Sequence, residues 1–151
     1  MPSLATNKKA RFDYEILETF EAGLVLSGQE VKSAKAGQVS LASSYVIVDS
    51  RRNLYLLNAT ISAYKRAGPL PDYDPRHSRK LLMHRKEIDY LAGKIRQSGL
   101  TIIPLSLYTK HNKIKLEIGL ARGKKKYDKR QTIRDRDDKR QINRLLKASH
   151  K

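Results

Sequence analysis

Two aspartates and a histidine lie close together in a proline-containing segment, GPLPDYDPRHSR. Asp72, Asp74 and His77 supply oxygen and nitrogen atoms of the kind that bind divalent cations and activate water in nucleases. A nuclease site needs rigidly held ligands, which two aspartates in a proline-rich loop do not guarantee. A turn followed by the start of a helix accounts for the same residues. A small metal-dependent nuclease therefore remains only a remote alternative.

Other catalytic patterns are missing from the sequence. His84, His111 and His150 are scattered among basic residues without metal-ligand spacing. The segment ARGKKK contains a Gly-Lys pair but lacks the spaced first glycine and the Ser/Thr of a phosphate-binding loop. No nucleophile and base can be paired convincingly. We therefore expect no enzymatic activity, no metal and no cofactor.

The charge balance indicates a polyanionic partner. Lys and Arg number 32 against 15 acidic residues in 151, a formal net charge of +17. An excess of this size repels itself in a compact chain and is usually retained because a polyanion neutralises it. There is no cysteine, no signal-peptide-like N-terminus and no apolar run of the ~18 residues that could span a membrane. A soluble cytoplasmic protein is expected.

The basic residues recur along the chain with aromatic residues between them, a pattern typical of nucleic-acid binding. The basic positions are Lys8, Lys9, Arg11, Lys32, Lys35, 76–86, Lys113 and Lys115, and the aromatic ones Tyr14, Tyr45, Tyr73, Tyr108 and Tyr127. RNA is favoured over duplex DNA because no recognition helix, zinc finger or basic zipper is present.

The chain divides into two regions of different character. Residues 1–121 carry 19 basic and 11 acidic side chains, whereas the last 30 residues carry 13 and 4. The first region consists of short apolar segments separated by turn residues, which predicts six or seven strands in a small barrel or a curled antiparallel sheet. Gly23 is expected to break the first of these segments. The predicted hairpins are 45–57, turning at 50–53, and 100–120, turning near His111 and Asn112.

Two helices are expected among the strands. The first spans 30–36 and ends at Gly37; the second spans 79–98, with Ser78 as N-cap and Gly99 just beyond its end. Leu82 lies off the apolar stripe of the second helix, and from the pattern alone a buried position near the helix start is preferred over an exposed one. Pro104 predicts an edge or a bulge in its strand.

The C-terminal segment has too few apolar residues to fold by itself. It reads GKKKYDKRQTIRDRDDKRQINRLLKASHK, with no proline and no glycine after Gly123. Such a segment can become helical on a partner.

Five stretches of the chain are distinctive: NKKARFDY (7–14), ETFEAGLVLSGQEVKS (18–33), SYVIV (44–48), RKLLMHRKEI (79–88) and LARGKKKYDKR (120–130). Together they resemble small protein B, the family of transfer-messenger RNA (tmRNA)-binding proteins of bacteria. The resemblance implies a mainly β fold: an oligonucleotide-binding (OB)-type antiparallel β-barrel with peripheral helices, over residues 1–122. It also implies a basic C-terminal tail, 123–151, that is helical only when bound.

The resemblance further implies an adaptor that acts in ribosome rescue by trans-translation. Such a protein binds the tRNA-like domain of transfer-messenger RNA, supports its alanylation by alanyl-tRNA synthetase and its delivery with elongation factor Tu, and enters the empty A site of a stalled ribosome. It stands in for the missing anticodon stem and codon, with its tail in the empty mRNA channel and near the decoding centre. No membrane or DNA partner is implied. A ribosome-associated protein that binds ribosomal RNA alone is the alternative.

Site residues follow from the matching positions. Glu21, Leu82 and Lys115 are implied to contact the tRNA-like domain, which favours an exposed Leu82. Lys9, Arg11, Lys32 and Lys35 are the further cations expected on the RNA-binding surface. Gly123 is the implied hinge to the tail. The implied ribosome-binding positions of the tail are Lys124, Lys125, Lys126, Tyr127, Asp128, Lys129, Arg130, Leu145 and Leu146.

Overall fold

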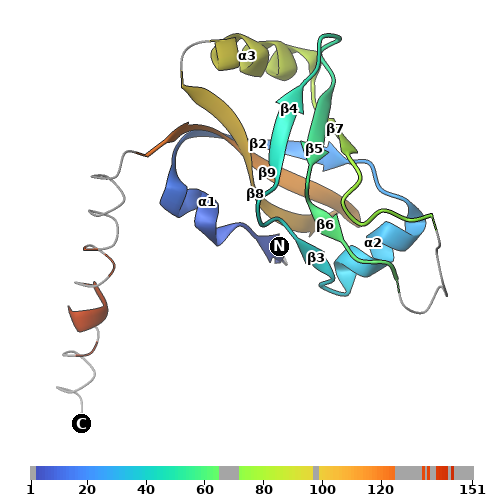
Figure 1. The fold of residues 1–151 in the computed structure, drawn as a ribbon, viewed down its shortest axis with the longest axis horizontal. Coiled ribbons are helices and arrows are strands. Elements are labelled where there is room, and N and C mark those ends of the chain that lie inside the picture. Colours follow the sequence, from blue (N-terminus) through green and yellow to red (C-terminus); the bar gives the residue numbers. More distant parts are fainter. Residues whose placement is uncertain are drawn as a thin grey trace.

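The apolar segments form strands that pair around a nearly closed ring in the computed structural model (Figure 1). The structure describes residues 3–64, 72–96, 99–124, 134, 136, 139–142 and 144. Its strands are β1 (Ser3–Thr6), β2 (Tyr14–Leu24), β3 (Val39–Ser40), β4 (Tyr45–Val48), β5 (Leu54–Leu57), β6 (Thr60–Ile61), β7 (Arg79–Leu82), β8 (Leu100–Lys110) and β9 (Lys113–Gly123). Its helices are α1 (Lys8–Asp13), α2 (Gly28–Lys35) and α3 (Arg85–Arg96).

Seven strands form one antiparallel sheet in the order β1-β8-β4-β5-β7-β2-β9. Because β8 also pairs with β9, the sheet returns on itself. One end of β8 pairs with β4 at Ile102 and the other with β1 at 106–108. The register shifts between Pro104 and Ser106, an irregularity of the kind that the edge or bulge expected at Pro104 would produce. The strands β3 and β6 form a separate two-stranded sheet.

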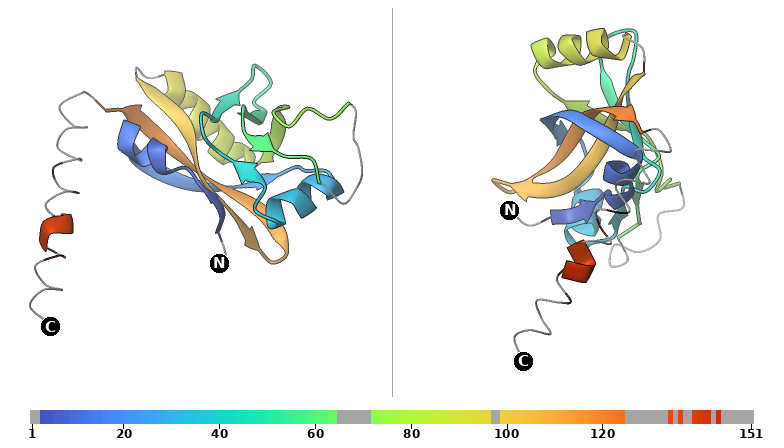
Figure 2. Two further views of the ribbon diagram at one scale, coloured as in Figure 1. Left: turned by 60° about the horizontal axis from the view of Figure 1, so that its bottom comes forward. Right: turned by 90° about the vertical axis from the view of Figure 1, so that its left-hand side faces the viewer.

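The core fills the inside of the ring because its strands alternate between apolar and polar residues. On β9, Leu116, Ile118 and Leu120 are buried, while Lys115 and Glu117 are partly exposed. Figure 2 shows α3 and α2 at separate places around the sheet, and α3 buries Ile88, Leu91 and Ala92. Both predicted hairpins and the short helix that ends before Gly37 are present.

Two sequence predictions about the elements are wrong. Residues 79–82 form a strand, in which Arg79 and Leu81 point inward while Lys80 and Leu82 point outward. The helix begins only at Arg85. Leu81 fits the apolar face of either element, so periodicity alone could not separate them. Gly23 does not break β2, since it pairs with Leu82 on one side and Lys115 on the other.

In the C-terminal segment, the described residues 134, 136, 139–142 and 144 are helical. The Arg136 guanidinium carbon lies 5.5 Å from the ring centroid of Phe12. The expectation that this segment is helical only when bound stays a prediction.

Candidate nucleic-acid interface

Three adjacent strands bring Glu21, Leu82 and Lys115, which the resemblance implies to contact RNA, onto one outer face. Across the sheet, Leu82 on β7 pairs with Gly23 on β2, and Gly23 pairs with Lys115 on β9. Lys115 in turn pairs with Tyr108 on β8. Their chain neighbours Leu81, Ala22, Leu116 and Leu107 are buried inside the ring. The row from Leu82 to Tyr108 therefore faces outward.

Glu21 lies on the same face, two residues before Gly23 on β2. Its Oε2 accepts a hydrogen bond from the Tyr108 hydroxyl at 2.5 Å and another from Lys110 Nζ at 3.4 Å. The hydrogen bond from Tyr108, with smaller contributions from Lys110 and Lys115, holds the pKa of Glu21 below its ordinary value. Glu21 is therefore an ionised acceptor near neutral pH. We call Glu21, Leu82, Tyr108, Lys110 and Lys115 the outer-face cluster.

Leu82 is the apolar member of this cluster and is 54% exposed. The preference for a buried Leu82 drawn from the periodicity alone is wrong, because that preference assumed a helix. A Cβ atom built on Gly23 would lie 3.5 Å from Leu82 Cβ and 3.7 Å from Lys115 Nζ. The leucine and the ammonium group thus flank a strand position without a side chain. The surface offers an apolar contact, a cation and a carboxylate side by side.

Arg11 borders the cluster from α1. Its guanidinium lies 3.6 Å from Glu117 Oε1, and Glu117 is the register partner of Glu21. Both side chains are well exposed, so the pair contributes little to stability. Arg11 remains available to a phosphate.

The other three predicted cations lie elsewhere. Lys9 lines a hollow with Asn7, Ser44, Tyr45 and Thr101. Lys32, on α2, has its Nζ 5.9 Å from the Tyr64 ring centroid. Lys35 lines a different hollow, next to His111 and Asn112 at the β8–β9 turn. These positions are exposed, but they do not join the outer-face cluster.

At the start of the C-terminal segment, the chain is held against α1. Gly123 pairs with Tyr14 at the end of β9, and the Lys124 backbone N–H donates to the Asp13 carbonyl at 2.9 Å. Lys124 Nζ also donates to the Arg11 carbonyl at 3.1 Å. These contacts hold Gly123 and Lys124 against β2 and α1, and the hinge implied at Gly123 stays a prediction. The positions Lys125, Lys126, Tyr127, Asp128, Lys129, Arg130, Leu145 and Leu146 lie outside the described residues.

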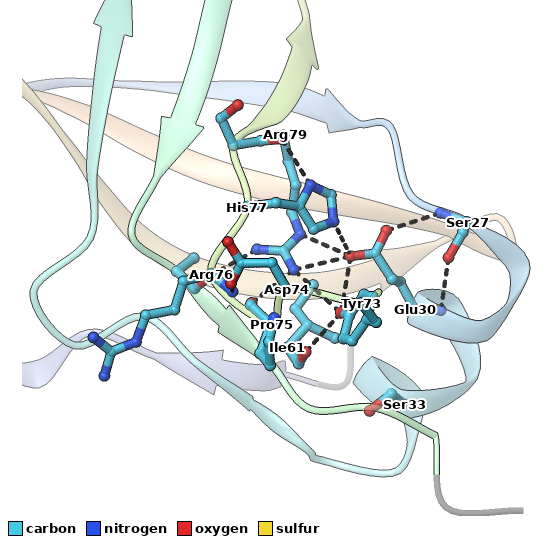
Figure 3. A network of polar contacts seen from close by, with 12 residues as sticks. Ser27, Glu30, Ser33, Ile61, Tyr73, Asp74, Pro75, Arg76, His77 and Arg79 are labelled. Atoms are coloured by element: carbon cyan, nitrogen blue, oxygen red, sulfur yellow. Dashed lines mark hydrogen bonds and ion pairs between the residues drawn. The ribbon is translucent and has the colours of Figure 1, made fainter. Parts of the chain in front are cut away.

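His77, from the loop that also carries Asp72 and Asp74, contacts the buried Glu30–Arg79 ion pair (Figure 3). His77 Nε2 lies 2.8 Å from Glu30 Oε2, and Asp74 accepts the backbone N–H of Arg76 at 2.9 Å. Asp72 is exposed and takes no part in either contact. Within the described part of the chain, no three His, Cys, Asp or Glu side chains are grouped to hold a metal ion. The arrangement gives the nuclease alternative no support.

Arg79 is the centre of this network and is only 1% exposed. Its Nε and Nη2 both lie 2.9 Å from Glu30 Oε2, while Nη1 donates to the Ala59 carbonyl and Nη2 to the Pro75 carbonyl, each at 2.8 Å. Glu30 also closes the capping box of α2 with Ser27. The network ties α2 to the segment that leads into β7.

Tyr108, Lys110 and Arg79 are residues whose roles sequence reasoning missed. The sequence identifies Tyr108 only as one aromatic among several, and Arg79 only as one cation in a basic run. Alternation along β8 places Tyr108 and Lys110 on one face, but only the β8–β9 and β2–β9 registers bring them to Glu21.

Among the described residues, no helix is long and apolar enough to cross a membrane.

Comparison with known proteins shows which family the chain belongs to. The family model described as "SmpB protein" matches residues 4–148. The SsrA-binding protein of Magnetococcus marinus is 51% identical over 147 residues, covering 97% of both chains. That of Streptomyces coelicolor is 50% identical and covers 96% of this chain and 90% of the relative.

A solved structure is also similar to this chain. It is described as "tmRNA-SmpB: a journey to the center of the bacterial ribosome", shares 47% identity, and superposes with a TM-score of 0.66 over 80% of this chain and 84% of that one. The sequence matches extend through the strands that carry the outer-face cluster and into the C-terminal segment. The chain belongs to the SmpB protein family.

Proposed function

We propose that this protein is the tmRNA-binding adaptor of trans-translation and that the outer-face cluster binds the tRNA-like domain of the RNA. Its relatives are SsrA-binding proteins, and the similar solved structure pairs SmpB with tmRNA and the bacterial ribosome. Like the family, the protein acts by binding and placement and not by catalysis. Its partners are tmRNA and the ribosome, and indirectly alanyl-tRNA synthetase and elongation factor Tu.

One observation carries the RNA-binding site: Glu21, Leu82 and Lys115, from three different strands, share one outward face. The Lys115 ammonium can pair with a phosphate, and the exposed Leu82 side chain can pack on an unstacked base or a ribose. The Glu21 carboxylate can accept from a base amino group or a 2′-hydroxyl. These three chemistries suit an irregular RNA surface better than a regular duplex.

The division of labour between body and tail belongs to the same proposal. Residues 1–122 form an RNA-binding barrel of the OB type, supported by the antiparallel strand ring. Residues 123–151 form the basic tail, which becomes helical in the empty mRNA channel near the decoding centre. The Lys124 contacts with α1 support a boundary immediately after the barrel. Lysine and arginine side chains of the tail meet phosphates, and Tyr127 stacks on a base.

Binding to the isolated tRNA-like domain of tmRNA tests this function. The measurement is a fluorescence-anisotropy titration across a salt series, with an ordinary alanine tRNA as competitor. Tight binding that keeps its preference for the tRNA-like domain as salt rises is expected, because counterion release does not distinguish between RNAs. Equal binding that collapses with salt would favour a protein that binds ribosomal RNA alone.

Matched variants locate the site within that assay. Glu21→Ala and Lys115→Ala should each weaken binding to the tRNA-like domain by about tenfold, the effect of about 1.4 kcal/mol. Glu15→Ala and Arg51→Ala remove one exposed charge of the same sign outside the cluster and should leave the preference intact. Equal losses in the cluster variants and their controls would exclude the outer-face cluster as the site.

A further inference from the structure

Among the described residues, the Glu21 carboxylate is held through one of its two oxygens. The Tyr108 hydroxyl and Lys110 Nζ both donate to Oε2. Within the described residues, no hydrogen bond reaches Oε1. One oxygen is thus fixed from β8, and the other remains available for a donor outside the protein.

Tyr108 is suited to hold this carboxylate. It is partly buried on β8, and its backbone pairs with Lys115 on one side and Ser3 on the other. Burial, followed by the hydrogen bond to Glu21, raises the pKa of Tyr108 above its ordinary value. The hydroxyl therefore stays protonated and remains a donor at any pH at which the protein works.

A fixed carboxylate also has a consequence for selectivity. Glu21 lies on a protein of net charge +17, among basic side chains that attract any phosphate. A carboxylate repels phosphate and accepts only from N–H or O–H donors, so RNA placed with a phosphate at this position binds poorly. The charged groups facing Glu21 are Lys110 on β8 and Lys115 and Glu117 on β9.

We propose that Tyr108 is a positioning residue of the RNA-binding surface: its hydroxyl holds Glu21 by Oε2 so that Oε1 accepts from a base amino group or a 2′-hydroxyl of the bound RNA. This inference rests on the proposed function. Tyr108 itself makes the site selective by orienting Glu21, not by touching the RNA through its hydroxyl.

The variant Tyr108→Phe removes the hydroxyl and keeps the ring. It should weaken binding to the tRNA-like domain about three- to tenfold, the loss of about one hydrogen bond to a charged group. Binding to the competitor alanine tRNA should change less than twofold. Tyr55→Phe, which removes a hydroxyl from β5 outside the cluster, is the matched control and should bind like the wild type.

A double-variant cycle separates positioning from direct contact. If Tyr108 acts through Glu21, the double variant Glu21→Ala/Tyr108→Phe binds no more weakly than Glu21→Ala alone. If the affinity loss of the double variant equals the product of the two single-variant losses, the hydroxyl contacts the RNA independently of Glu21, and the positioning role is overturned. If Tyr108→Phe keeps the wild-type preference for the tRNA-like domain over alanine tRNA, the positioning role is overturned as well.

A titration in the free protein provides a readout that does not depend on RNA. The carboxyl carbon of Glu21, followed by 13C NMR, should titrate at a higher pH in Tyr108→Phe, because the main cause of its lowered pKa is gone. An unchanged midpoint would refute the contact. If the wild type shows no preference among RNAs, the proposed function fails and the positioning role fails with it, whatever the titration shows.

Discussion

Replacement of Arg79 by methionine tests how far the ring of strands depends on its buried ion pair. Methionine replaces the unbranched aliphatic part of the arginine side chain but leaves Glu30, which is 4% exposed, without its guanidinium partner. The Ala59 and Pro75 carbonyls each lose a hydrogen bond from the guanidinium, although the Ile61 backbone N–H still donates to the Pro75 carbonyl at 3.0 Å. Removing one member of a buried pair costs about 3–5 kcal/mol. Because the Ser27 N–H and His77 still reach Glu30, the lower end of this range, about 3 kcal/mol, is expected.

Urea denaturation followed by circular dichroism at pH 7 measures this loss. With an m-value of about 1.5 kcal/mol/M, the midpoint should fall by about 2 M. Arg85→Met is the matched control, since Arg85 is exposed and its Nε lies 3.8 Å from Asp89, and its unfolding free energy should change by less than about 0.5 kcal/mol. A loss below about 1 kcal/mol for Arg79→Met would refute the reasoning, because the buried carboxylate would then not need its partner.

Three further predictions concern acid, the apolar contact and the tail. Burial raises the pKa of Glu30, but hydrogen bonds from Ser27, Arg79 and His77 outweigh this effect, so the pKa is lowered. The free energy of unfolding should therefore fall as the pH drops below the ordinary value of 4.5. Urea titrations at several pH values should show a steeper fall in the wild type than in Glu30→Gln. Leu82→Ala should change the unfolding free energy by less than about 1 kcal/mol because the side chain is exposed, yet weaken binding to the tRNA-like domain about tenfold in the anisotropy assay. Truncation after Lys126 should leave that binding nearly intact and abolish tagging in a stalled-ribosome assay, and equal loss of both would contradict the division between barrel and tail.

Where local pattern and tertiary pairing agree, the sequence suffices to predict the structure. The alternation from Ile114 to Leu120 and the turn at His111 and Asn112 predict the β8–β9 hairpin because side chains of a strand point alternately to its two faces. Residues 79–82 lack such a decisive signal. Leu81 satisfies a helical stripe and a strand equally, and β7 forms because β5 and β2 offer it paired edges on both sides.

By itself, the sequence determines the charge, the antiparallel β character, the two main hairpins and the family motifs, because composition and short-range periodicity are local properties. The placement of the site depends on contacts across the sheet. Strand register places Leu82, Lys115 and Glu21 on one face and brings Tyr108, 87 positions away along the chain, to the Glu21 carboxylate. The burial of Arg79 against Glu30 likewise depends on the tertiary structure. Arg79 is one of several basic residues in its segment, and Glu30 becomes its neighbour only when the strands have paired.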